Sequence, residues 1–274
     1  MKIVSPQLVA IGALALASSY PGLTQPAQQP PPESGMSFPT PAGPDPIANE
    51  GVIEDGAVDA LKEMSNFLMS ANTLEADTVG TLDVVTNNGQ RIQLDGTTNY
   101  KIRRPGFVIT YNSDIKSRKF IYDGKTFTVY SPKLGYYATA PAPGTNREVL
   151  DTIYNKFGIS LPLEDLFRWG DSGANAARLQ ALQSAYKVGT ATLDGVPTDH
   201  FAFREGDVDW EVWIDEGPQP LPRKLVIVDR SDPARPTFTS RLRWKVNPTF
   251  SNSDFTFVPD ANAKRIQLAT FKGE

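Results

Sequence analysis

Residues 73–104, TLEADTVGTLDVVTNNGQRIQLDGTTNYKIRR, decide the fold of this chain. The segments 73–86 and 91–104 have the composition of β-strands, and the sequence Asn87-Asn88-Gly89 lies between them. Asn and Gly favour a tight turn at this place because both residues tolerate positive φ. The stretch therefore predicts a β-hairpin, and with it an antiparallel sheet at the start of the domain.

Further strand-like runs follow the hairpin on both sides of a helical insert. They read FVITYN (107–112), RKFIYD (118–123), KTFTVYS (125–131) and YYATA (136–140), then TATLD (190–194), DHFAFR (199–204), DWEVWID (209–215), RKLVIVDR (223–230) and TFTSRLRWKV (237–246). Short turns such as Asp123-Gly124 join them. The chain has no long βαβ alternation, so the sequence predicts an α+β fold with an antiparallel sheet rather than a doubly wound parallel fold.

Three helices are expected. Apolar residues at three- and four-residue steps predict an amphipathic helix over 55–71, with Asp55 as its cap and its apolar side on the sheet. The sequence from Thr145 to Glu148 is a capping box, and Gly158 is placed to end the helix that follows. A weaker pattern predicts a further helix over 175–186.

The N-terminal part of the chain does not belong to the core. Residues 1–19 contain Lys2, a short apolar run and small residues near Ala17, the pattern of a cleaved signal peptide. The alternative is an uncleaved anchor, but the ten-residue apolar run would rise only ~15 Å as a helix. We expect residues 20–54 to form a Pro-rich linker, because nine of the 23 prolines lie between positions 21 and 46. We therefore expect a folded domain over 55–268 and a periplasmic protein without a transmembrane anchor.

Composition excludes several classes of function. The chain has no cysteine, so it forms no disulfide, binds no metal through thiolates and carries no acylated cysteine. Its net charge is −4, and this gives no positive field that would hold a nucleic acid.

The enzyme motifs in the sequence are incomplete. Gly170-Asp171-Ser172-Gly173 resembles the nucleophile turn of chymotrypsin-like proteases, but the only histidine, His200, follows this serine instead of preceding it. Ser172, Asp199 and His200 have the chain order of another hydrolase class, yet the Gly-x-Ser-x-Gly elbow is missing. One histidine also makes a poor metal site. The sequence therefore predicts a protein that is not an enzyme and has no cofactor or metal.

Two tryptophan-containing strands differ in pattern. In 237–246, Leu242, Trp244 and Val246 alternate with basic residues, so we expect a half-buried strand with a solvated basic stripe. In 209–215, Trp213 lies among acidic residues on the polar side. It could cover a neighbouring strand or a tether, or it could line a binding surface, and the first explanation is commoner.

Several phrases, in order and spacing, resemble the family of the outer-membrane lipoprotein carrier LolA and, more closely, an uncharacterised family of predicted periplasmic proteins related to it. They are Arg104-Pro105-Gly106, the hairpin Asp123 to Thr139, the run Pro222 to Ile227 and the closing strand FTFVP at 255–259. The resemblance covers most of 55–268. It implies a strongly curved, unclosed antiparallel half-barrel whose concave face is covered by helices acting as a lid, with acyl chains between them.

The resemblance also implies a role for Arg104. In the carrier family the arginine of the Arg-Pro turn bonds to helix backbone and holds the lid, and Arg104 occupies the matching place. The alternative is a solvated arginine at a strand end. This chain departs from the carrier in a longer insert over 141–186 and in FVITY (107–111), which lacks the carrier's tryptophan. Both departures fall where the ligand would lie, so lipoprotein trafficking stays open.

The sequence thus predicts a monomeric, periplasmic, non-enzymatic protein that binds or carries a hydrophobic ligand, a lipid or acyl chain. One alternative is an ordinary filled core, which periodicity cannot distinguish from an open site. Another is a sensor or interaction module of an envelope-stress or signalling system, with a protein partner. The predicted ligand-binding residues are Arg104, Phe107, Ile109, Tyr111, Phe127, Val129, Trp210 and Trp244 on the sheet, and Leu166, Phe167, Leu179 and Leu182 in the helical cover.

Overall fold

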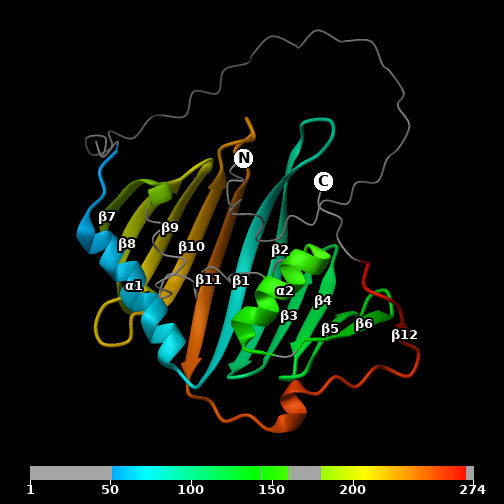
Figure 1. The fold of residues 1–274 in the computed structure, drawn as a ribbon. Helices are drawn as coiled ribbons and strands as arrows, with labels where there is room; N and C mark the ends of the chain where they lie inside the picture. Colours follow the sequence, from blue (N-terminus) through cyan, green and yellow to red (C-terminus); the bar gives the residue numbers. More distant parts are fainter. Residues whose placement is uncertain (1–50, 143, 160, 162–179, 270–274) are drawn as a thin grey trace, which may run out of the picture.

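One continuous sheet organises the protein in this computed structural model, which describes residues 51–142, 144–159, 161 and 180–269 (Figure 1). Its described strands follow the order β12-β6-β5-β4-β3-β2-β1-β11-β10-β9-β8-β7. Neighbouring strands run antiparallel except for β12 and β6, which are parallel. The sheet curves, and its end strands β12 and β7 do not pair with each other, so the predicted unclosed half-barrel is confirmed.

The element bounds are α1 Asp55–Ser70, β1 Thr73–Val85, β2 Arg91–Arg103, β3 Phe107–Ser113, β4 Ser117–Tyr122, β5 Thr126–Ser131, β6 Tyr136–Pro141, α2 Asn146–Phe157, β7 Leu182–Leu193, β8 Val196–Glu205, β9 Val208–Asp215, β10 Pro222–Asp229, β11 Thr237–Val246, η2 Asn252–Phe255 and β12 Lys264–Arg265. The strands form two meanders, β1 to β6 and β7 to β11, and the pairing of β1 with β11 joins them.

The hairpin that decides the fold is formed as predicted. β1 and β2 pair along their whole length, from Thr73 opposite Arg103 to Val85 opposite Arg91. The turn closes through Gly89, whose φ of +82° is a conformation that glycine adopts without strain. β1 therefore lies at the middle of the sheet with a long partner on each side.

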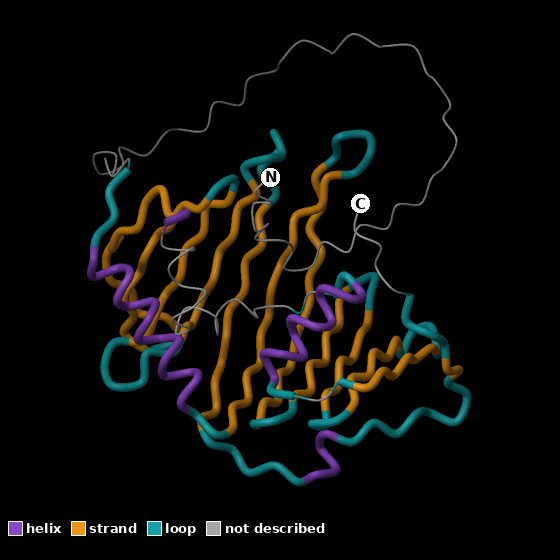
Figure 2. Tube along the Cα trace, viewed as in Figure 1, coloured by secondary structure: helices purple, strands orange, loops and turns teal. Residues whose placement is uncertain are grey.

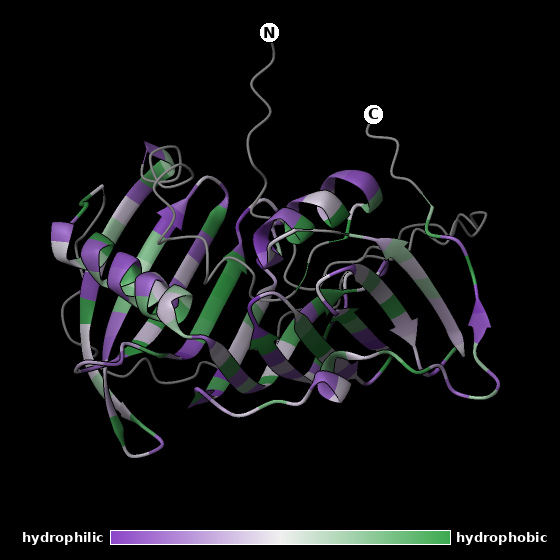
Figure 3. Cartoon of the chain, turned by 60° about the horizontal axis from the view of Figure 1, so that its bottom comes forward, coloured by the Kyte–Doolittle hydropathy of each residue, from purple (hydrophilic) through white to green (hydrophobic). Residues whose placement is uncertain are grey.

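The two faces of the sheet differ in chemistry. Along β11, Leu242 is buried in the concave core, whereas Arg241, Arg243 and Lys245 are exposed on the convex face. Figure 3 shows apolar and polar residues alternating along the strands. Lys245 lies opposite Glu75 of β1 and binds its carboxylate at 3.1 Å. The predicted half-buried strand with a solvated basic stripe is thus confirmed.

Helix α1 crosses the concave side of the second meander (Figures 1 and 2), where Leu61, Met64 and Leu68 are fully buried. The expectation that Asp55 caps this helix is wrong, because the N-cap is Glu54 and Asp55 is the first helical residue. The segment before the helix is held extended by a parallel bridge between Ile53 and Ala185 at the edge of β7, so the helix cannot begin earlier. The Glu54 carboxylate accepts a hydrogen bond from the backbone of β7, at Lys187.

Helix α2 lies on the same side, over the first meander (Figure 2). The predicted capping box between Thr145 and Glu148 is present, and Gly158 ends the helix in the left-handed conformation. Val149 and Ile153 are buried in the same apolar cluster as the concave side chains of the sheet. Both helices therefore cover one continuous apolar face.

The helix predicted over 175–186 is wrong from Leu182 onward, because Leu182–Leu193 is strand β7. The spacing of Leu179 and Leu182 fits a helix, but pairing with β8 satisfies the backbone here and overrides that local preference. Leu166, Phe167, Leu179 and the 170–173 motif lie outside the described residues. So do residues 1–50, with the predicted signal peptide and most of the predicted linker.

After β11 the chain crosses the convex face as a segment that we name the outer strap, residues 247–266. Phe255 is completely buried there against Val108 and Ile121. The Phe257 ring lies 5.1 Å from that of Tyr137. The expectation of a closing strand over 255–259 is wrong, since the chain forms the short helix η2 and then irregular structure. These aromatic side chains fasten this part of the strap across the strands, and the chain then pairs with β6 further on, at Lys264–Arg265.

Candidate functional site

The concave face gathers the sheet residues that sequence reasoning selected. Phe107, Ile109 and Tyr111 of β3 lie opposite Ile102, Tyr100 and Thr98 of β2, on the face that holds the core. The remaining selected sheet residues with a side chain on this face are Phe127 and Val129 of β5, Trp210 of β9 and Trp244 of β11. The structure therefore brings these residues onto one surface.

Part of this surface is closed in the structure, whereas Tyr111, Val129 and Trp244 are partly exposed. The Phe107 side chain is 3% exposed and that of Phe127 is fully buried, with 6.3 Å between their ring centroids. Trp210 stacks on Phe203 at 4.2 Å in the second meander. Leu182 is also buried in this cluster, but it belongs to strand β7 and not to a helical cover. A ligand reaches the buried side chains Phe107 and Phe127 only if the residues that cover them move.

Arg104 joins the sheet to helix α1. Its guanidinium donates from Nε to the carbonyl of Ala71 at 3.1 Å and from Nη2 to the carbonyl of Leu68 at 3.0 Å. The last carbonyls of a helix have no partner within the helix, and a positive charge at this end is favoured by the helix dipole. Burial lowers the pKa of the guanidinium from its ordinary value. Arg104 thus makes the contact with helix backbone that the family resemblance implies.

Asn146, the first residue of α2, joins the same turn to the other helix. Its Oδ1 accepts a hydrogen bond from the Gly106 backbone at 2.6 Å, and its Nδ2 donates to the carbonyls of Arg103 and Gly106 at 2.8 and 3.2 Å. We name residues 103–106 the Arg-Pro turn. This turn is bonded to α1 by its own Arg104 and to α2 by Asn146.

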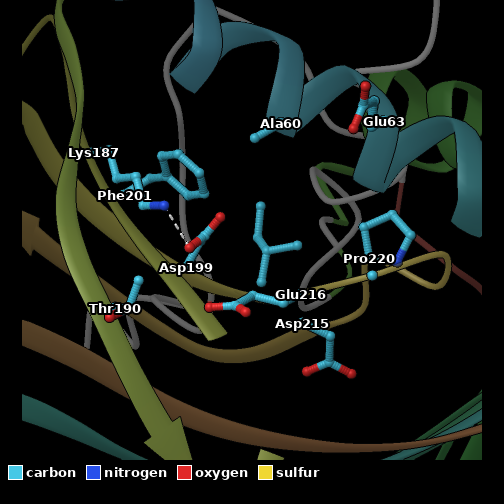
Figure 4. A pocket seen from close by; sticks show the side chains of 11 residues that line it. Ala60, Glu63, Lys187, Thr190, Asp199, Phe201, Asp215, Glu216 and Pro220 are labelled. Carbon is cyan, nitrogen blue, oxygen red and sulfur yellow. Dashed lines mark ion pairs between the residues drawn. The ribbon is translucent and has the colours of Figure 1, made fainter. Parts of the chain in front are cut away.

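A cavity of about 380 Å³ lies between α1 and strands β7 to β9 (Figure 4). Phe201 and Ile214 form apolar parts of its wall. Lys187 and Asp199, also in the wall, form an ion pair of 2.6 Å. The cavity is therefore apolar on one part of its surface and charged on another.

Asp199 and His200 do not form a catalytic pair. Asp199 lies opposite Ile214 on the concave face, whereas His200 lies opposite Trp213 on the convex face. His200 Nε2 is 2.8 Å from the Glu211 carboxylate, and its ring stacks on Trp213 at 3.8 Å. A hydrolase triad of Ser172, Asp199 and His200 would need Asp199 to bond to His200, and the sheet separates these two side chains.

Trp213 covers neighbouring strands on the convex face. Its ring lies between the His200 imidazole of β8 and the Lys224 ammonium of β10, which is 4.0 Å from the ring centroid. The first of the two explanations for this tryptophan therefore holds. Only 8% of its side chain surface is exposed.

Two negative findings concern the described residues alone. None of their helices is long and apolar enough to cross a membrane. No group of three histidine, aspartate or glutamate side chains in 51–269, the undescribed gaps aside, is arranged to hold a metal ion.

Residues 57–269 match the family described as predicted periplasmic protein (DUF2092). The chain belongs to this family. No curated protein matches it significantly. Solved structures similar to this DUF2092 protein include an uncharacterized conserved protein from Thermus thermophilus, with 10% identity, a TM-score of 0.46 and coverage of 77% of this chain and 99% of that one.

Two further structures are similar to the DUF2092 protein. Mycobacterium tuberculosis lipoprotein LppX shares 13% identity, with a TM-score of 0.43 and coverage of 72% of this chain and 99% of that one. The LolA superfamily protein NE2245 from Nitrosomonas europaea shares 8% identity, with a TM-score of 0.34 and coverage of 73% and 97%.

Sequence reasoning missed two features of the DUF2092 site. Asn146 follows the capping threonine, a position where a polar residue is ordinary, so no local pattern indicates its bonds to a turn 40 residues earlier. Lys187 and Asp199 lie on adjacent strands, and their pairing depends on the register of β7 against β8, which contains bulges. The sequence shows neither relationship.

Proposed function

We propose that this protein is a periplasmic, non-enzymatic binding or carrier protein for a hydrophobic ligand, a lipid or acyl chain, exported by a cleaved leader over residues 1–19. One observation carries the proposal. The apolar concave face is covered by α1 and α2, and side chains bond both helices to the Arg-Pro turn. The helices can move away from the sheet without breaking a pair of strands.

The free energies of the contacts involved favour opening of the helical cover by a bound ligand. Hydrogen bonds contribute about 0.5–1.5 kcal/mol each, and about 1.5–3 kcal/mol when one partner is charged. The polar links of Arg104 and Asn146 together therefore amount to several kcal/mol. Opening also exposes apolar surface to water, but an acyl chain takes over those contacts at ~0.8 kcal/mol per buried methylene. About twelve methylenes give on the order of 10 kcal/mol, which is larger than the polar links alone and offsets part of the cost of exposing the helices' apolar sides.

The positions of the charged side chains support binding rather than catalysis. The candidate acid-base pair of Asp199 and His200 is divided between the two faces of the sheet. The concave side chains of Phe107, Ile109, Phe127 and Val129 are aromatic or aliphatic. Thr128 points to the other face, whereas Ser131 ends β5 on the concave face and accepts a hydrogen bond from Arg118. The apolar part of this face can bind an apolar chain.

The test is to purify the mature protein from its native host and to measure bound lipid by native mass spectrometry and solvent extraction. A neutral fluorescent probe, N-phenyl-1-naphthylamine, then reports binding in the delipidated protein. We expect co-purified lipid and saturable probe binding. Absence of both would overturn the proposal.

A pair of isosteric variants locates the site. Val129→Thr adds a hydroxyl to the concave face and should weaken probe binding, because an apolar ligand cannot bond to that hydroxyl. Val79→Thr makes the same change on the convex face, where the valine is 64% exposed, and should leave binding unchanged. Equal effects of the two variants on probe binding would indicate that the probe binds outside the concave face.

A further inference from the structure

The cavity beside α1 extends the concave face toward solvent (Figure 4). Its volume of about 380 Å³ falls within the ~300–1,000 Å³ of small-molecule sites. Ala60 of α1 lies on one side, and Phe201 of β8 and Ile214 of β9 lie on the other. Lys187, Thr190 and Glu216 are exposed at its rim. The cavity thus has an inner end and an open end.

The inner end is continuous with the apolar interior. Phe201 is 5% exposed and Ile214 is 3% exposed, and both belong to the cluster that includes Phe107 and Trp210. An apolar chain that enters the cavity therefore contacts Phe201 and Ile214 of this cluster. The cavity and the proposed ligand face thus share the packed side chains of Phe201 and Ile214.

The open end has an excess of carboxylates. Lys187 is paired with Asp199 at 2.6 Å, and Asp215 is paired with Arg223 at 2.6 Å, so these four charges cancel in two pairs. Glu63 and Glu216 also line the cavity, and neither has an ion-pair partner within the described part of the chain. Figure 4 shows Asp199 and Glu216 on the sheet side and Glu63 on α1. Among the described residues, two negative charges therefore lack an ion-pair partner.

We propose that this cavity binds the positively charged head of an amphiphile, with an ammonium group at the carboxylates and its acyl chain along Phe201 and Ile214. The inference rests on the proposed hydrophobic-ligand function and specifies the class of ligand. A cation in a partly enclosed cavity is attracted to the two carboxylates, and an anionic head is repelled by them. The Lys187–Asp199 pair adds no net charge, so it does not cancel this preference.

Matched twelve-carbon compounds test the ligand class. Dodecylammonium, dodecanol and dodecanoate compete with N-phenyl-1-naphthylamine on the delipidated full chain, at concentrations below micelle formation. We expect dodecylammonium to bind about tenfold or more tightly than dodecanoate, with dodecanol between them, and added salt to narrow the difference.

Charge variants locate the effect. Glu216→Gln should lower the preference for dodecylammonium several-fold, and Glu216→Lys should abolish or invert it. Asp207→Asn is the control, because it removes one carboxylate from the exposed β8–β9 turn and should leave the preference unchanged. Melting curves check that each variant is folded.

The outcomes separate the two proposals. Equal binding of the three compounds, or an equal response to Glu216→Gln and Asp207→Asn, overturns the cationic-head inference and leaves the hydrophobic-ligand function standing. Failure of the probe and of all three compounds to bind overturns both.

Discussion

Arg104 Nη2 donates a hydrogen bond of 3.0 Å to the carbonyl of Leu68 in the last turn of α1. The arginine lies beyond the end of β2, so the bond joins the rigid sheet to the part of the helix whose carbonyls lack helical partners. The sulfur of Met69 lies 3.8 Å from Nη1 of the same guanidinium. Arg104 thus holds the end of α1 and leaves its apolar side to pack on the sheet.

Replacing Arg104 by leucine should free this end of α1. We expect the free energy of unfolding to fall by about 2–4 kcal/mol, because two charge-assisted bonds are lost. We also expect faster uptake of N-phenyl-1-naphthylamine in stopped-flow fluorescence. Arg243→Leu, on the exposed convex face, is the control for loss of an arginine. Unchanged uptake in Arg104→Leu would show that the residue does not control access.

Asn146→Ala should loosen α2 in the same way. The variant loses three hydrogen bonds to the Arg-Pro turn, and we expect the free energy of unfolding to fall by about 1–3 kcal/mol in urea titrations. Asn155→Ala is the matched control, since Asn155 lies on the same helix and is exposed. Hydrogen exchange should show earlier exchange in α2 than in α1. Equal stability of the two alanine variants would contradict a holding role for Asn146.

The sequence predicts a helix or strand well when the residues that determine it lie close together in the chain. Thr145, Glu148 and Gly158 define α2 because capping chemistry depends on neighbours within one turn. The alternation in 237–246 identifies the buried side of β11 for the same reason. The N-cap at Glu54 escapes sequence reasoning because a bridge to Ala185, far along the chain, sets it.

Long-range pairing also explains the errors in the helical insert and the outer strap. Leu182 is placed in a strand by β8, and Phe255 is placed on the convex face by Val108 and Ile121. The concave site residues of the sheet could be selected from strand alternation alone. The hydrogen bonds of Asn146 and the pairing of Lys187 with Asp199 could not, because they join segments whose relative position only the complete fold determines.

Gly80→Ala tests the close packing between β1 and β11. An added Cβ at Gly80 would lie 2.8 Å from the Thr239 carbonyl oxygen and 3.3 Å from the Phe238 ring, so backbone must shift. We expect a loss of about 1–3 kcal/mol in the free energy of unfolding, as for other overpacked sites. Gly189→Ala in β7 meets no atom within 4 Å and should change stability by less than about 0.5 kcal/mol. Similar losses in both variants would indicate a general intolerance of alanine in the strands.

The outer strap should become less stable in acid. Asp254 forms an ion pair of 2.7 Å with Lys101, and this bond together with those from Ser251 lowers the pKa of Asp254 well below its ordinary value of 3.8. The charged carboxylate therefore stabilises the fold at pH values above 3.8, and this contribution is lost as the pH falls through the lowered pKa. Asp254→Asn lacks the contribution at every pH. We expect the melting temperature of the variant to lie below that of the parent at pH 6 and the two to converge toward pH 2. In a Lys101→Met background, Asp254→Asn should lower the melting temperature by less at pH 6, because the main cause of the lowered pKa of Asp254 is gone. A melting-temperature difference between Asp254→Asn and the parent that stays constant with pH would contradict the role given to the Asp254 carboxylate.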